Sequence, residues 1–152
     1  MLAERIGLKD IAPLHQEEGG PGYGRIGKLA RRCSLQALAE TVKKALGVET
    51  VRVAGDLKLT VGSVAVCTGS GSGLLEDFLR SSAQVYLSGD LRYHDALEVR
   101  YARRGMIDIG HFASEHIMVS ALANRLTAEL DALGAAIDVV AFEHEKDPFC
   151  LL

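Results

Sequence analysis

Strand-like apolar runs alternate with helix-like segments along most of the chain, and this alternation constrains its fold more than any other feature. Helical spacing of apolar residues predicts helices at residues 34–47, 74–82, 94–105 and 113–133. Runs rich in β-branched residues predict strands at residues 50–55, 63–69, 84–90, 106–110 and 137–143. The pattern predicts an α/β fold, a mixed sheet with helices on both faces.

Individual residues mark the ends of several predicted elements. Ser34 is a plausible N-cap and Gly47 lies just past the end of the same helix, while Gly105 would end the helix at 94–105. The short polar segment between strands 50–55 and 63–69 could form a hairpin. The prolines and glycines before residue 28 predict a connector at 1–28, which leaves one α/β lobe at 29–152.

Composition narrows the class of protein. The 17 basic residues lie scattered among 20 acidic ones, which gives no support for nucleic-acid binding. No apolar run is long enough to cross a membrane. The three cysteines are odd in number and far apart, which fits a reducing compartment better than a disulfide framework. We therefore expect a cytoplasmic protein whose partners are neither nucleic acid nor membrane.

A glycine-rich loop follows the second predicted strand, where ligands of open α/β sheets commonly bind. Its backbone N–H groups could hold a phosphate, and Asp90 on the next strand could bind a ribose. The loop lacks the Lys-Ser or Lys-Thr of a P-loop, and Leu74 stands where a dinucleotide fingerprint needs glycine. A tight turn therefore stays the alternative to substrate binding for the loop residues Gly69, Ser70, Gly71, Ser72 and Gly73.

Two further segments follow predicted strands and carry titratable groups. "GDLRYHD" places Asp90, Tyr93 and Asp95 around His94, which can titrate near neutrality, and Tyr93 is a candidate substrate contact. His94 and Asp95 could instead simply begin a helix. "GHFASE" places His111 and Glu115 one helical turn apart. Imidazole nitrogen with carboxylate oxygen suits Zn, Fe, Mn or Ni, but a helix-start ion pair has the same spacing.

Seven ordered segments together resemble the NIF-three-like family, whose members are also called GTP cyclohydrolase I type 2 homologues. They are "GYGRIGKL", "SLQALAETVKKALG", "VRVAGD", "VAVCTGSGSGLLEDF", "VYLSGDLRYHDAL", "MIDIGHFASE" and "DPF". The resemblance implies a two-lobed α/β protein with two metal ions in the cleft between its lobes, assembled as a toroidal hexamer. It also implies that His111 and Glu115 bind metal, that His94 is a candidate for proton transfer or substrate contact, and that the loop at 69–73 borders the cleft.

The resemblance covers only the C-terminal lobe of this family. Family members carry an N-terminal lobe whose His-His pair and aspartate are the other metal ligands, and this sequence lacks that pattern. We therefore expect a metal-binding lobe that acts in a cyclohydrolase-like hydrolase only if a separate N-terminal lobe protein or another protomer supplies the missing ligands. Uncovered apolar surface predicts a homo-oligomer. The alternatives are a non-catalytic metal-binding or interaction module and a nucleotide-binding regulatory domain; the small-molecule substrate is unidentified.

Overall fold

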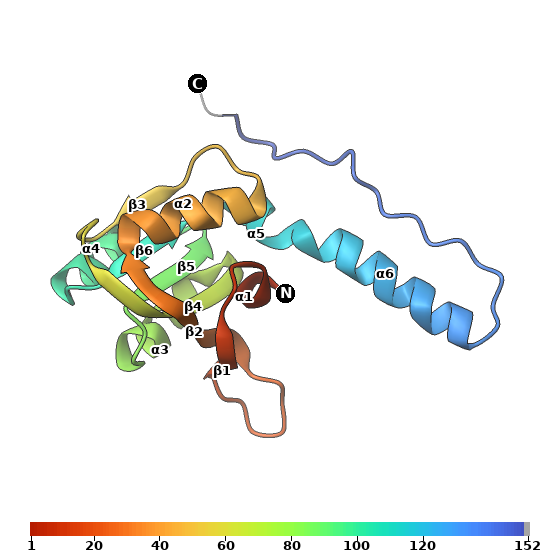
Figure 1. The fold of residues 1–152 in the computed structure, drawn as a ribbon, viewed down its shortest axis with the longest axis horizontal. Coiled ribbons are helices and arrows are strands. Elements are labelled where there is room, and N and C mark those ends of the chain that lie inside the picture. The colour runs from red at the N-terminus through yellow and green to blue at the C-terminus, as the bar shows by residue number, and fades with distance from the viewer. Residues whose placement is uncertain (151–152) are drawn as a thin grey trace.

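A computed structural model describes residues 1–150 and contains one six-stranded sheet with the strand order β1-β2-β4-β5-β6-β3 (Figure 1). Strands β4, β5 and β6 are parallel, and the other neighbouring pairs are antiparallel, so the predicted mixed sheet is confirmed. The strands are β1 (Lys9–His15), β2 (Tyr23–Ser34), β3 (Arg52–Ala54), β4 (Thr60–Ser70), β5 (Val85–Gly89) and β6 (Gly105–Asp108).

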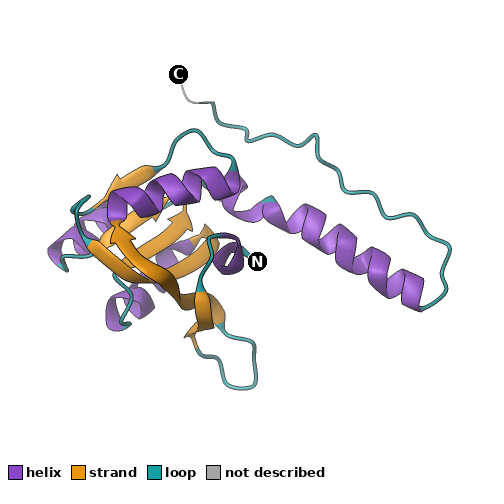
Figure 2. Ribbon diagram, viewed as in Figure 1, coloured by secondary structure: helices purple, strands orange, loops and turns teal. Residues whose placement is uncertain are grey.

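Helices cover both faces of this sheet, as the alternating pattern predicts (Figure 2). They are α1 (Leu2–Arg5), α2 (Leu35–Leu46), a 3-10 turn η1 (Gly71–Leu74), α3 (Leu75–Arg80), α4 (Tyr93–Tyr101), α5 (His111–Glu115) and α6 (Ile117–Ala132). Successive strand residues point to opposite faces. Val85 and Leu87 of β5 accordingly pack with α1 and α2, whereas Tyr86 packs with α3 and α4.

Helix α2 forms where the sequence predicts it. The Ser34 side chain accepts a hydrogen bond from Ala37 N at 3.1 Å, and Gly47 takes the left-handed conformation with φ 69°. These two residues satisfy backbone groups that a helix leaves unpaired at its ends. The apolar face of α2 is buried against the sheet through Leu35, Leu38 and Val42.

The prediction that residues 1–28 form an irregular connector is wrong for their local structure. These residues contain α1, β1 and the first part of β2. Pro13 is tolerated in β1, which is an edge strand. Gly24 has φ 59°, and a Cβ there would lie 3.0 Å from the Leu74 side chain. Proline and glycine thus mark an edge strand and a close approach, not a break in the sheet. A domain boundary at residue 28 stays a prediction.

Two further expectations are wrong, one about a hairpin and one about the end of a helix. The segments 50–55 and 63–69 form no hairpin, because β3 pairs with β6 while β4 lies between β2 and β5. Gly105 begins β6 and does not end α4, whose last residue is Tyr101. A Cβ on Gly105 would lie 2.9 Å from the Leu35 side chain, so close packing of α2 on the sheet explains this glycine.

The C-terminal part of the chain also differs from the prediction. The long helix expected at 113–133 is divided at His116 into α5 and α6, and no strand forms at 137–143. Because a strand needs a neighbour for its backbone groups, β-propensity alone does not form one. Figure 1 shows α6 projecting away from the sheet. No helix within residues 1–150 is long and apolar enough to cross a membrane.

Candidate metal centre

The loops that carry the predicted site residues meet at one end of the sheet. Because β4, β5 and β6 are parallel, their carboxyl ends lie side by side. We call this the carboxyl end of the sheet. Gly69 lies near the end of β4, Asp90 directly follows β5, and His111 begins α5 just after β6. The sequence-based expectation of a shared edge for these three loops is thus confirmed.

His111 lies between two carboxylates at the carboxyl end of the sheet. Its Nδ1 atom is 2.9 Å from Asp90 Oδ2, and its Nε2 atom is 3.2 Å from Glu115 Oε2. About half of each side chain is exposed to solvent. The hydrogen bond to Asp90 raises the pKa of His111, and the charge of Glu115 acts in the same direction. Asp90, a candidate ribose ligand by sequence, thus orients the imidazole.

The backbone of Gly69 lies directly against the His111 and Glu115 side chains. Its φ is 65°, and it lies in the register shift between β4 and β5. A Cβ at this position would overlap Glu115 Oε1 and would lie 3.3 Å from His111 Nε2. The absence of a side chain at Gly69 therefore leaves room for the two donor groups to converge above its backbone.

Three buried hydroxyl groups hold the glycine-rich loop. Gly69 N donates to Ser114 Oγ at 2.7 Å, and Tyr86 OH donates to Gly71 O at 2.7 Å. A longer contact of 3.4 Å joins Ser88 Oγ to Gly69 O. Burial raises the pKa of Tyr86, which favours the protonated donor. Sequence reasoning missed all three residues, and only the position of Ser114 inside "GHFASE" hinted at a role.

A buried carboxylate joins the loops that follow β5 and β6. Asp108 Oδ1 accepts a hydrogen bond from Gly110 N at 2.9 Å, and Oδ2 accepts one from Leu91 N at 3.1 Å. Arg52 also pairs with this carboxylate. Only 3% of the Asp108 side chain is exposed, although that of Arg52 is largely exposed. Asp108 was missed by sequence reasoning, although an aspartate inside the apolar run "MIDIG" was a usable signal.

The far part of the glycine-rich loop contacts α4 instead of the His111 pair. Ser72 Oγ donates to Asp95 Oδ2 at 2.5 Å, and Arg92 N donates to the same oxygen at 2.8 Å. Burial disfavours the charged Asp95 carboxylate, but the hydrogen bonds from Ser72 and Arg92 outweigh this effect and lower its pKa. The geometry of Asp95 supports the helix-start interpretation. Gly73 has open space around it.

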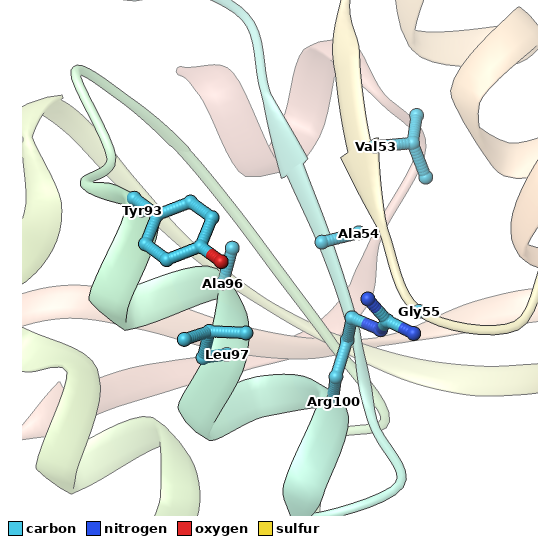
Figure 3. A pocket seen from close by; sticks show the side chains of 7 residues that line it. All are labelled: Val53, Ala54, Gly55, Tyr93, Ala96, Leu97 and Arg100. Carbon is cyan, nitrogen blue, oxygen red and sulfur yellow. The ribbon is translucent and has the colours of Figure 1, made fainter.

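Tyr93 and His94 lie in the first turn of α4. Tyr93 is exposed and lines a groove between α4 and β3 (Figure 3). The His94 ring packs edge-on against the Tyr93 ring, with 5.7 Å between centroids. In the described part of the chain, no hydrogen bond or ion pair joins either residue to His111 or Glu115. A catalytic role for His94 and a substrate contact for Tyr93 stay predictions.

The donor set suits part of a transition-metal site. A ligating histidine commonly donates its second ring N–H to a carboxylate, which is the position that Asp90 occupies at His111 Nδ1. His111 Nε2 and the Glu115 carboxylate then face the same space. Across residues 1–150, no group of three or more His, Cys, Asp or Glu side chains is arranged to hold a metal ion. The described residues therefore offer two converging donors, fewer than a zinc centre takes from protein.

Comparisons with known proteins identify one family and its fold. The family model described as Duf34/NIF3 (NGG1p interacting factor 3) matches residues 1–148. The GTP cyclohydrolase 1 type 2 homolog of Nostoc sp. is 34% identical over 128 residues, covering 83% of this chain and 49% of that protein. The protein of the same name from Bacillus subtilis is 33% identical over 143 residues, covering 94% of this chain and 38% of that protein.

Solved structures give the same result for the fold. A Bacillus cereus protein related to NIF3 is 32% identical and superposes with a TM-score of 0.82, covering 86% of this chain and 36% of that one. A Staphylococcus aureus hypothetical protein has a TM-score of 0.91 at 23% identity, covering all of this chain and 63% of that one. The chain thus spans about half or less of the curated relatives described above.

Proposed function

The chain belongs to the Duf34/NIF3 family, and on this premise we propose that it is a metal-binding lobe whose His111 and Glu115 bind a divalent transition metal ion. One observation carries the proposal. His111 Nε2 and Glu115 Oε2 lie 3.2 Å apart above the backbone of Gly69, while Asp90 holds the other nitrogen of the imidazole. A cation between the two donors would replace their direct contact.

The chemistry of the donors narrows the identity of the ion. One imidazole nitrogen and one carboxylate favour Zn, Fe, Mn or Ni over Ca or Mg. Two protein ligands leave open coordination positions, because structural zinc takes four protein ligands and catalytic zinc usually three. We propose that a separate N-terminal lobe protein or another protomer supplies the remaining ligands, as part of a dinuclear centre.

The proposed activity is hydrolysis of a small molecule by the completed centre. Relatives of this chain carry the name GTP cyclohydrolase 1 type 2 homolog, which supports a hydrolase of the cyclohydrolase type. A divalent cation held by His111, Glu115 and the missing ligands would polarise the substrate and lower the pKa of bound water. The chain itself would orient the His111 imidazole through Asp90 and leave its glycine-rich loop to contact substrate. His94, an exposed imidazole, stays the candidate for proton transfer.

Replacement of His111 by alanine tests the proposed site. We expect Co²⁺ to broaden the backbone amide signals of Gly69 and Phe112 first in a ¹⁵N-labelled sample, because both adjoin the proposed donors. His111→Ala should abolish this local broadening, whereas the matched control His94→Ala should preserve it. Titration above neutral pH is appropriate, since the raised pKa of His111 lets protons compete with the cation. Unchanged broadening in His111→Ala would refute the proposed site.

Helix α6 supports the further proposal that the chain assembles with other subunits. No α6 residue is buried, and Met118, Leu122 and Leu126 expose about half of their surface to solvent. Exposed apolar surface of this kind is commonly covered by a partner. A homo-oligomer or a complex with a separate N-terminal lobe would cover it. We also propose a cytoplasmic location, because all three cysteines are free.

The assembly proposal predicts a result in light scattering. The purified chain should have a mass of at least a dimer, and Leu126→Glu should lower that mass because it places a charge in the apolar face of α6. Asn124→Glu is the matched control, since it adds the same charge at an exposed polar position of the same helix. A monomeric mass across a wide concentration range would contradict a homo-oligomer.

A further inference from the structure

Ser114 lies inside α5 between the two proposed metal ligands. Its side chain is fully buried, whereas about half of each neighbouring ligand, His111 and Glu115, is exposed. The hydroxyl makes two hydrogen bonds of 2.7 Å, accepting from Gly69 N and donating to His111 O. Serine in a helix commonly bonds only to a carbonyl of its preceding turn. The bond from Gly69 is thus an additional link between α5 and the end of β4.

The two hydrogen bonds of Ser114 fix the position of α5 relative to the end of β4 in the candidate centre. One bond reaches the backbone of the ligand His111, and the other reaches Gly69, above which both donor groups converge. We propose that Ser114 is a positioning residue, which sets the distance between the Gly69 backbone and the His111 and Glu115 donor groups. This distance in turn would set the affinity of the two donors for a cation. This inference rests on the proposed metal-binding function.

Two other hydroxyl groups provide an internal comparison for this role. Tyr86 OH donates to Gly71 O, and Ser88 Oγ lies near Gly69 O, so both hold the same loop as Ser114. Both residues are fully buried members of β5, and their hydroxyl bonds do not reach α5. A role in loop stability alone predicts similar effects for all three hydroxyls. A positioning role predicts a specific effect for Ser114.

The expected effects of removing each of the three hydroxyl groups therefore differ. Among residues 1–150, Ser114 carries the only hydroxyl that bonds the loop to α5. We expect Ser114→Ala to lower Co²⁺ affinity about 10- to 100-fold, as is typical when a group that orients a metal ligand is lost. Tyr86→Phe and Ser88→Ala should leave the affinity close to that of the unaltered chain. Ser114→Cys keeps a weaker donor and acceptor, so its loss should be intermediate.

Co²⁺ titration of the full chain, followed by its visible absorption bands, tests the inference. Thermal unfolding of each metal-free variant gives the stability loss for comparison, and Ser114→Cys serves if Ser114→Ala does not fold. A loss of affinity at Ser114 that exceeds the losses in Tyr86→Phe and Ser88→Ala at matched stability would support the inference. Equal losses in all three, or unchanged affinity and absorption bands in the Ser114 variants, would overturn it.

A separate variant distinguishes failure of this inference from failure of the proposed function. Retained Co²⁺ binding in His111→Ala would refute the metal site itself, and the positioning role with it. Loss of binding in His111→Ala together with unaltered binding in Ser114→Ala would refute only the positioning role.

Discussion

Gly69→Ala is expected to weaken Zn²⁺ or Co²⁺ binding about 10- to 100-fold, comparable with the loss of a group that orients a metal ligand. The added methyl would overlap Glu115 Oε1 and would lie 3.3 Å from His111 Nε2. The Glu115 side chain must then rotate away from the space that it shares with the imidazole. One substitution of a residue that is itself no ligand would thus separate the two donors.

The same substitution also strains the backbone, so affinity and stability have to be measured separately. Gly69 has φ 65°, where alanine costs about 1–2 kcal/mol relative to glycine. Isothermal titration calorimetry gives the affinity and urea unfolding gives the stability. Gly73→Ala is the matched control, because a Cβ there meets no atom within 4 Å and its φ is not positive. Equal affinity of Gly69→Ala and Gly73→Ala would contradict the convergence of the donors above Gly69.

Asp108→Ala is expected to lower the free energy of unfolding by about 3 kcal/mol, because it leaves two backbone N–H groups without their acceptor. Those groups belong to Leu91 and Gly110, and the first of them is buried. Leu91 follows Asp90, and Gly110 precedes His111. The substitution therefore also loosens the two loops that bring the Asp90 carboxylate and the His111 imidazole together. The metal affinity should therefore fall as well.

Urea unfolding monitored by circular dichroism measures this loss of stability. Arg52→Ala is the control for the ion pair, and we expect it to cost less than about 1 kcal/mol because the Arg52 side chain is largely exposed. Asp108→Asn should have an intermediate effect, since its amide keeps one acceptor oxygen but loses the other. A loss in Asp108→Ala no larger than that in Arg52→Ala would show that the carboxylate does not hold these loops.

Much of the fold follows from local sequence patterns. Alternation of strand-like and helix-like segments predicts the α/β class, and the cap residues predict α2 because both act within one helical turn. The errors arise where a distant partner decides the structure. Residues 9–15 become a strand because β2 provides a neighbour, whereas 137–143 has strand-like composition but no neighbouring strand among the described residues.

The candidate site was predictable to the extent that its contacts are local. His111 and Glu115 are one helical turn apart, so their contact follows from the sequence once α5 is assumed. The roles of Ser114 and Asp108 depend on backbone groups from distant segments, such as Gly69 N and Leu91 N. Side chains that bond to backbone leave no complementary residue type to recognise, which is why sequence reasoning missed them.

The central claim is that the His111 imidazole and the Glu115 carboxylate share a cation, and anomalous scattering from a zinc-soaked crystal above neutral pH tests it most directly. We predict one anomalous peak above Gly69, about 2.0–2.2 Å from His111 Nε2 and from a Glu115 carboxylate oxygen. Asp90 should remain bonded to His111 Nδ1. A map without a peak at this position, with the imidazole and the carboxylate turned away from each other, would contradict the claim.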